Sequence, residues 1–250
     1  MTNLAENSVP SMIQELAWTQ TMQAIKDSTR FDDLAEFRAC MEEDLPYNSA
    51  LTRKRYTSTL IRYFFPAASL DNLPRKVWQV YHDDALLETL TRYQYLTQEP
   101  TVAHFVTRHL IPMVPGSMLE RQVLKEFIRE VDPKDRPKMV KRLAKVVRRL
   151  GFVVRERQRD VVAQLHPSKT AFLILLHHIF APTPRIVTLG DILDDPFWKY
   201  LGFRQADVIR RTLHEANAQE LIASYAAIDQ LEQITTRYSL DEWFHQRLQL

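Results

Sequence analysis

The apolar residues in the first third of the chain recur with the period of an α-helix. In residues 31–44 and 49–65 they return every three or four positions, which predicts two amphipathic helices. Ser49 is placed to cap the second helix, and Pro66 ends it. Two helices joined by a turn of about four residues fit a helix-turn-helix. They fit plain helix packing equally well.

The second helix of this pair has a basic, hydroxyl-rich side. Arg53 and Arg55 lie there near its start, where a helix-turn-helix approaches DNA. Residues 70–110 keep the helical period and are rich in aromatic residues, which in a helical bundle fill the core more often than they stack on bases. Residues 111–117 contain two prolines and a glycine and therefore predict a domain boundary.

A second helical pair is expected between residues 118 and 150. Residues 118–131 predict a helix, residues 132–137 a turn, and residues 137–150 another helix that stops at Gly151. The last helix has an apolar side, formed by Met139, Val140, Leu143, Val146, Val147 and Leu150. Its other side is basic and consists of Lys138, Lys141, Arg142, Lys145, Arg148 and Arg149.

The pattern then changes to runs of β-branched residues. Residues 152–157 and 160–165 predict a hairpin, and the basic residues at its tip and on its strands are Arg155, Arg157 and Arg159. Helix, turn, basic helix and basic-tipped hairpin is the order of a winged helix. In that fold the basic helix enters the major groove and the hairpin tip reaches the adjacent backbone.

The last third of the chain repeats this order more weakly. An apolar helix is expected over residues 168–180, followed by a break at Pro182. Thr188 and Asp191 then form the pattern of a capping box for a short helix. A further helix is expected over residues 204–218. The segment after Pro182 therefore predicts a second unit of the same kind.

This second unit differs from the first in charge. Residues 221–228 and 231–238 predict its hairpin, and Ser239 with Glu242 predicts a cap for a terminal helix. Residues 203–237 hold four basic and five acidic side chains, a net charge of −1. We therefore expect this unit to pack against protein or to bind protein, while the first unit binds nucleic acid.

Together these segments predict a mainly α-helical fold. A helical N-terminal domain with a helix-turn-helix is followed by winged-helix-like units with short β-hairpins. The expected domains are residues 1–115, residues 116–181 and residues 182–250.

Composition excludes several classes of enzyme. The chain has only four glycines among its 250 residues, and they are too far apart to form a dinucleotide-binding or P-loop motif. The eight histidines and the single cysteine, Cys40, show no metal-binding spacing. The acid pairs at residues 83–84 and 194–195 fit helix termini better than a cation site. We expect no enzymatic activity, catalytic residue, cofactor or metal.

The net charge of +2 hides a strong asymmetry. Residues 134–159 hold eleven basic and two acidic side chains, a net charge of +9, so the other 224 residues carry −7. An acidic protein with one basic segment is typical of a protein that binds a polyanion. The alternative is a solvated helix face that the acidic remainder of the chain neutralises.

The sequence also predicts a cytoplasmic protein. Residues 1–14 are polar and contain Glu6, so they show no secretory signal, and one cysteine cannot form an internal disulfide. The longest apolar run, residues 171–181, is interrupted by two histidines and is much shorter than the roughly 20 residues of a membrane span. We expect no membrane partner.

The chain resembles the BrxA component of bacteriophage-exclusion (BREX) defence systems. The similar features lie within residues 32–165: the segment at residues 48–55 (NSALTRKR), the aromatic helical stretch at 93–106, and the basic second unit. The resemblance implies an all-α, non-catalytic protein with two helix-turn-helix elements that binds double-stranded DNA. By position, it implies DNA contacts at Arg53, Arg55, Lys141, Arg142 and Lys145. The C-terminal unit after Pro182 departs from this family.

The function predicted from the sequence is therefore sequence-tolerant binding of double-stranded DNA, as an antiviral accessory protein beside a methylase and an ATPase that are separate chains. The alternatives are a scaffold whose basic helix docks on an acidic protein, and an RNA-binding protein, because basic winged helices bind both nucleic acids.

Overall fold

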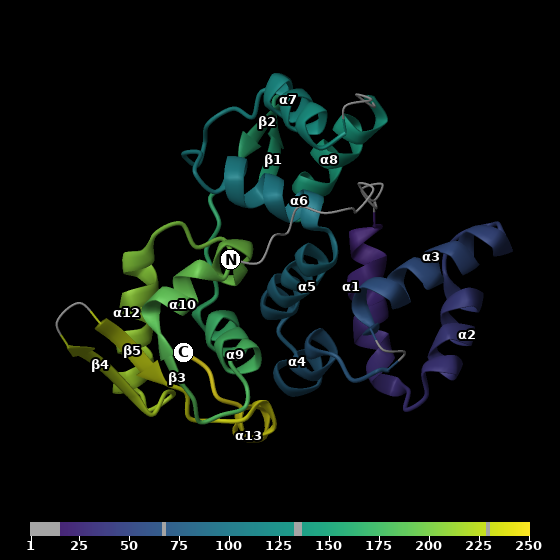
Figure 1. The fold of residues 1–250 in the computed structure, drawn as a ribbon. Helices are drawn as coiled ribbons and strands as arrows, with labels where there is room; N and C mark the ends of the chain where they lie inside the picture. Colours follow the sequence, from purple (N-terminus) through teal and green to yellow (C-terminus); the bar gives the residue numbers. More distant parts are fainter. Residues whose placement is uncertain (1–15, 67–68, 133–136, 229–230) are drawn as a thin grey trace. The chain divides into compact units, whose positions relative to one another are not determined.

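The computed structural model describes residues 16–66, 69–132, 137–228 and 231–250 (Figure 1). In these ranges the protein is mainly helical, with two small antiparallel sheets of short strands, which confirms the fold class in its general form. Most of the turn expected at residues 132–137 lies outside the described residues, and so do Lys134 and Arg136 of the basic segment and the polar residues 1–14. No helix in the described ranges is both long and apolar enough to span a bilayer.

Contacts divide the described residues into two compact units. Unit 1 contains Leu16 and residues 96–165, and unit 2 contains residues 17–95 and 166–250. These bounds differ from the three segments suggested by the sequence. The prolines and glycine of residues 111–117 form a bend inside unit 1, because the helix before that bend packs with the basic helix after it.

Unit 1 alternates helices with short extended segments. It begins with α6 (Pro100–Phe105), which continues as one π-helical turn, η3 (Val106–Leu110). Helices α7 (Arg121–Val131) and α8 (Pro137–Arg149) follow, and strands β1 (Val153–Glu156) and β2 (Arg159–Val162) form the predicted hairpin. Gly151 has a φ of +78° and its N–H donates to Arg148 O, so it ends α8 as expected.

The helix expected at residues 118–131 begins three residues late. Met118 instead forms an antiparallel bridge with Val161 of β2, and the N–H of Leu119 donates to Asp160 O at 2.8 Å. These backbone groups therefore extend the hairpin by a third, very short extended segment. The helical period of residues 118–131 could not reveal this pairing, because Met118 and Leu119 are apolar in either conformation.

The core of unit 1 forms where the three helices meet the sheet. Phe105 of α6 and Phe127 of α7 are fully buried, with ring centroids 5.0 Å apart. Val153 and Val162 are paired across the hairpin and are buried on the same face of the sheet. The apolar side of α8 completes this core, as its sequence pattern predicted.

The first part of unit 2 is helical. It contains α1 (Trp18–Asp27), η1 (Ser28–Arg30), α2 (Leu34–Asp44), α3 (Ala50–Phe64), α4 (Leu73–Tyr81) and most of α5 (Asp84–Gln98). Ser49 accepts a hydrogen bond from Thr52 N, which confirms it as the cap of α3. Asp83 accepts from Ala85 N and Leu86 N at the start of α5, so this acidic residue lies at a helix terminus as expected.

The rest of unit 2 surrounds the apolar helix α9 (Lys169–Ile179). After it come β3 (Ile186–Thr188), α10 (Leu189–Asp194), α11 (Phe197–Tyr200), α12 (Ala206–Ala218), β4 (Ser224–Ile228), β5 (Leu231–Thr235) and α13 (Leu240–Gln246). The capping boxes predicted for α10 and α13 are both present. The sequence did not predict β3, which pairs with β5 at the edge of a sheet ordered β3-β5-β4.

The two sheets belong to segments with the same order of elements. We call residues 100–162 the first repeat and residues 169–235 the second repeat. Each has a helix, a short extended segment, two further helices and a hairpin, with one additional short helix, α11, in the second. In each, the first extended segment pairs antiparallel with the last strand. The repeated order of elements expected from the sequence is therefore present, and the pairing of the first extended segment with the last strand is a further similarity that the sequence did not predict.

Candidate nucleic-acid interface

Helix α8 separates apolar from basic side chains. Met139, Leu143 and Val147 are among its buried residues. Lys138, Lys141 and Lys145 are exposed, whereas Arg142, Arg148 and Arg149 are half-buried. Because each buried residue contributes to the core of the first repeat, the helix is fixed with its basic side turned outward.

The hairpin carries Arg157 on its two-residue turn and Arg155 and Arg159 on its strands. Glu156 pairs with Arg159, so Arg157 and Gln158 form a two-residue turn. Both have positive φ values, +43° and +69°, in the region that a two-residue hairpin turn requires and that Asn-Gly adopts most easily. Placing Arg and Gln there costs backbone strain of order 1 kcal/mol or more for each residue. Arg155, Arg157 and Arg159 are all exposed.

Asp160 connects the helix to the hairpin. Its Oδ1 lies 3.1 Å from Nη1 of Arg155 on β1 and 3.7 Å from Nε of Arg148 on α8. Arg155 and Asp160 are direct partners across the hairpin, which brings their side chains to the same face. The carboxylate is only 14% exposed, so it forms the inner member of this group. We call Asp160, Arg148 and Arg155 the Asp160 clasp.

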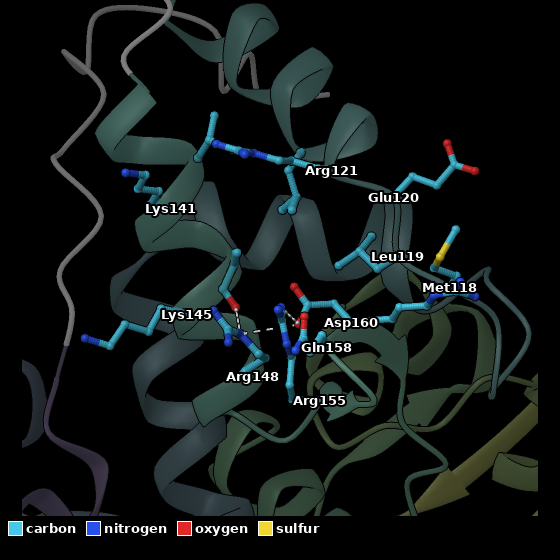
Figure 2. Close-up of a pocket in the computed structure, with 14 residues that line it drawn as sticks. Met118, Leu119, Glu120, Arg121, Lys141, Lys145, Arg148, Arg155, Gln158 and Asp160 are labelled. Atoms are coloured by element: carbon cyan, nitrogen blue, oxygen red, sulfur yellow. Dashed lines mark hydrogen bonds and ion pairs between the residues drawn. The ribbon is translucent and has the colours of Figure 1, made fainter.

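A groove lies between α8, the start of α7 and the hairpin, with the Asp160 clasp inside it (Figure 2). Its volume is about 690 Å³. Six cationic side chains line it: Arg121, Lys141, Lys145, Arg148, Arg155 and Arg159. Two acidic residues, Glu120 and Asp160, also line it, together with the apolar side chains of Met118 and Ala144.

The basic residues predicted at this site have different partners. Arg149 donates to Leu16 O, and Arg148 donates from Nε to Ala144 O at 3.0 Å in addition to its ion pair. Five others have no hydrogen bond or ion pair to any residue that the structure describes: Lys138, Lys141, Arg142, Arg157 and Arg159. The structure therefore brings together one set of cations that are held by protein and one set that are available to a ligand.

Arg53 and Arg55, the predicted contacts of the first helix-turn-helix, belong to unit 2. The guanidinium of Arg53 donates to Glu42 O and to Tyr47 O, each at 2.7 Å, and so braces the turn between α2 and α3. Arg55 is exposed on α3. The sequence pattern placed both residues on one basic side, but it could not show that Arg53 bonds the backbone carbonyls of Glu42 in α2 and Tyr47 in the turn.

The second repeat has a counterpart of the Asp160 clasp with a different balance of charge. Glu232 of β5 accepts from Nε of Arg210 on α12, with both carboxylate oxygens 3.0 Å away, and from the hydroxyl of Tyr225 at 2.5 Å. Nη1 of Arg210 donates to Asp207 at 2.8 Å. The Tyr225 hydroxyl and the Arg210 guanidinium lower the pKa of Glu232. Two carboxylates, those of Glu232 and Asp207, therefore face the single positive charge of Arg210.

The remaining candidates for chemistry are a metal-ligand cluster and the thiol of Cys40, which lies on α2 outside the groove. Within the described ranges, no three residues of the His, Cys, Asp and Glu types are placed to hold a metal ion. The thiol of Cys40 donates to Asp44 Oδ2, and this hydrogen bond with burial raises its pKa to about 11, so the nucleophilic thiolate is disfavoured. The groove presents six cationic side chains and two carboxylates beside apolar side chains of the same elements.

Sequence reasoning missed three residues of this groove. Asp160 was assigned only to the second strand of the hairpin, although the one signal for its role was visible, since it is the sole carboxylate in β2 and follows a run of arginines. Met118 and Arg121 both fall within the helix that the sequence predicts over residues 118–131. Only the pairing of Met118 with Val161 brings the start of α7 to the groove.

Comparisons of the chain with protein-family models, with curated proteins and with solved structures find no match.

Proposed function

We propose that the protein binds double-stranded DNA through the first repeat, without catalysis of its own. The observation that carries this proposal is the set of five unpartnered cations on α8 and the hairpin tip, on elements held rigidly by one core in the part of the chain that the structure describes. Residues 96–165 hold fifteen basic and eight acidic side chains, a net charge of +7. Phosphate groups on a duplex are the partners such a surface fits best.

The order of elements supports a specific mode of binding. Helix, short strand, helix, helix and hairpin, with the short strand paired to the last strand, is the arrangement of a winged helix. In that arrangement α8 enters the major groove, where an α-helix fits between the two backbones, and the tip at Arg157 follows the adjacent phosphates. The strain at Arg157 and Gln158 is consistent with a tip selected for contact rather than for stability.

The resemblance to the BrxA family extends the proposal to a biological role. The protein would act as a DNA-binding accessory in a phage-defence system, with a methylase and an ATPase as separate partners. Deletion of the gene from a host with such a system should then restore plaque formation by a phage that the system restricts. Normal restriction in the deletion strain would contradict this role and leave DNA binding unaffected as a proposal.

Salt dependence of binding tests the DNA proposal. If five or six side chains contact phosphates, log K against log[salt] for a duplex of about 25 base pairs should have a slope of about −5, from roughly −0.9 per contact. An RNA duplex and a single strand of the same length measure the preference for DNA. A flat salt response, or stronger binding to RNA than to the DNA duplex, would contradict the proposal.

A further inference from the structure

The cations of the first repeat fall into two classes, according to whether a carboxylate holds them. Arg148 and Arg155 both meet Oδ1 of Asp160, at 3.7 and 3.1 Å, and their side chains are 34% and 52% exposed. Lys141, Arg142 and Arg157 have no such partner among the described residues. The groove therefore contains two arginines that a carboxylate holds and, beside them, Lys141, which has no such partner among the described residues.

A carboxylate changes what an arginine can bind. It restricts the side chain to few rotamers and leaves the remaining N–H donors of the planar guanidinium pointing in set directions. It also repels phosphate, because two anions then compete for one cation. An arginine held in this way is a poorer phosphate anchor than a free lysine, but it is well prepared for a planar ligand with two neutral acceptors.

Guanine presents such a pair of neutral acceptors in the major groove. Its O6 and N7 both accept hydrogen bonds and match the spacing of two guanidinium N–H groups. We propose that Arg148 and Arg155, positioned by Asp160, read guanine bases, while the unpartnered cations of α8 and the hairpin tip hold phosphates. This inference rests on the proposed function, and it adds a base preference to binding that is otherwise set by charge.

The groove is consistent with this division. The Asp160 clasp lies inside it, between α8 and the hairpin, and Lys141 and Lys145 extend from α8 beside it (Figure 2). Donors remain available on both arginines, because Arg148 uses Nε and Arg155 uses Nη1 for the contacts described above. Arg210 of the second repeat differs, because both Nε and Nη1 of its guanidinium donate to carboxylates, those of Glu232 and Asp207.

The test is binding of the full chain to matched duplexes that differ in one atom of guanine. Replacing guanine by 7-deazaguanine removes the N7 acceptor and leaves base pairing and backbone charge intact. One lost bidentate contact should weaken binding to a guanine-containing duplex by about 5- to 100-fold. Equal affinity for the two duplexes would overturn the inference while leaving the proposed DNA binding in place. Absence of binding to any duplex would overturn both.

Variants of Asp160 separate positioning from simple charge. Asp160→Asn removes one negative charge from the groove, so affinity for the 7-deazaguanine duplex should stay the same or rise. The ratio of the two affinities should nevertheless fall to near one, because the arginines lose their fixed orientation. Asp160→Glu should restore part of the ratio. A ratio unchanged in Asp160→Asn would overturn the positioning role of this residue.

A second variant keeps the inference testable if Asp160→Asn does not fold. Arg155→Lys conserves charge at an exposed position but removes the two-donor geometry of the guanidinium. It should reduce the preference for guanine over 7-deazaguanine and leave the salt slope unchanged. Arg211→Lys on the second repeat, also exposed, should change neither quantity. An intact preference in Arg155→Lys would contradict base reading by Arg155.

Discussion

The two repeats share an order of elements but differ in how their charges are partnered. In the first, Asp160 pairs with Arg148 of α8 and Arg155 of β1, so one carboxylate meets two guanidinium groups. In the second, Arg210 of α12 contacts both Asp207 and Glu232, so two carboxylates meet one guanidinium. Helix α8 therefore presents surplus positive charge, whereas α12 belongs to a closed ionic network.

This difference shows that position in the fold does not by itself set the charge that a helix presents. α8 and α12 occupy the same place in the order of elements, and each is fixed by buried apolar residues. Residues 96–165 carry a net charge of +7, whereas residues 166–250 hold eight basic and ten acidic side chains, a net charge of −2. If DNA binding follows charge rather than topology, only the first repeat should bind.

The largest expected effects are losses of stability when one buried aromatic residue is truncated in the core of either repeat. Phe127 of the first repeat and Phe172 of the second are fully buried, so Phe127→Ala and Phe172→Ala should each destabilise by about 3–5 kcal/mol. Hydrogen exchange should increase in α7 and α8 for the first variant and in α9 and α12 for the second. Equal increases in both regions for both variants would show that the repeats unfold as one unit.

Charge reversal on α8, compared with charge reversal on α12, should give the next largest effect. Reversal of Lys141, Arg142 and Lys145 to glutamate should lower duplex affinity at least about 100-fold at roughly 0.1 M salt, because three phosphate contacts become repulsive. Arg211→Glu on α12, an exposed and unpartnered cation in the part of the chain described, should change affinity by less than about threefold. Fluorescence anisotropy with a labelled duplex measures both. A comparable loss when Arg210 and Arg211 are both reversed would refute the division between the repeats.

A smaller effect, a gain in duplex affinity, is expected when the two carboxylates that bond Arg210 are replaced by amides. Asp207→Asn with Glu232→Gln removes both partners of Arg210 and should raise duplex affinity by about threefold, because α12 then resembles α8 in charge. The matched control is Asp71→Asn with Asp241→Asn, which changes net charge equally around Lys76. An equal gain in the control would assign the effect to net charge alone.

The smallest expected effect is a pH dependence of the free energy of unfolding, to which one histidine of each repeat contributes. Burial lowers the pKa of His109 in the first repeat and of His177 in the second below the ordinary 6.5. The unfolded chain then binds more protons than the folded chain below about pH 6.5, so the free energy of unfolding should fall as pH falls through that value. His177→Gln should weaken this dependence, as measured by urea unfolding from neutral to mildly acidic pH. An identical pH dependence in wild type and variant would contradict it.

The helices and caps were predictable from the sequence because they depend on local signals. Ser49, Thr188 and Ser239 were identified as caps from the residues beside them, and the apolar side of α8 followed from its period. The hairpins were predictable because a short polar tip separates two runs rich in apolar residues in each, and in the first hairpin these runs are β-branched. Their pairing with Met118 and with β3 was not, because these segments are too short to show a period.

The candidate site was predictable only as a list of cations. The sequence predicted that the basic residues lie on one side of α8 and on the hairpin. In the structure these residues are exposed or half-buried. The sequence could not distinguish Arg148 and Arg155 from their neighbours, because the partner that holds them, Asp160, lies twelve and five residues away in the chain. It could not show that Arg53 braces a turn for the same reason, since its partners are backbone carbonyls of other residues.

Site-specific photo-crosslinking to a DNA duplex tests the central claim most directly. A benzophenone amino acid replaces either Gln158, at the tip of the first hairpin, or Leu231, at the start of β5. Both residues are exposed and uncharged, and each lies at or next to the start of the last strand of its repeat. The account predicts strong crosslinking from position 158 that high salt abolishes, and background crosslinking from position 231. Crosslinking from position 231 without crosslinking from position 158 would contradict it.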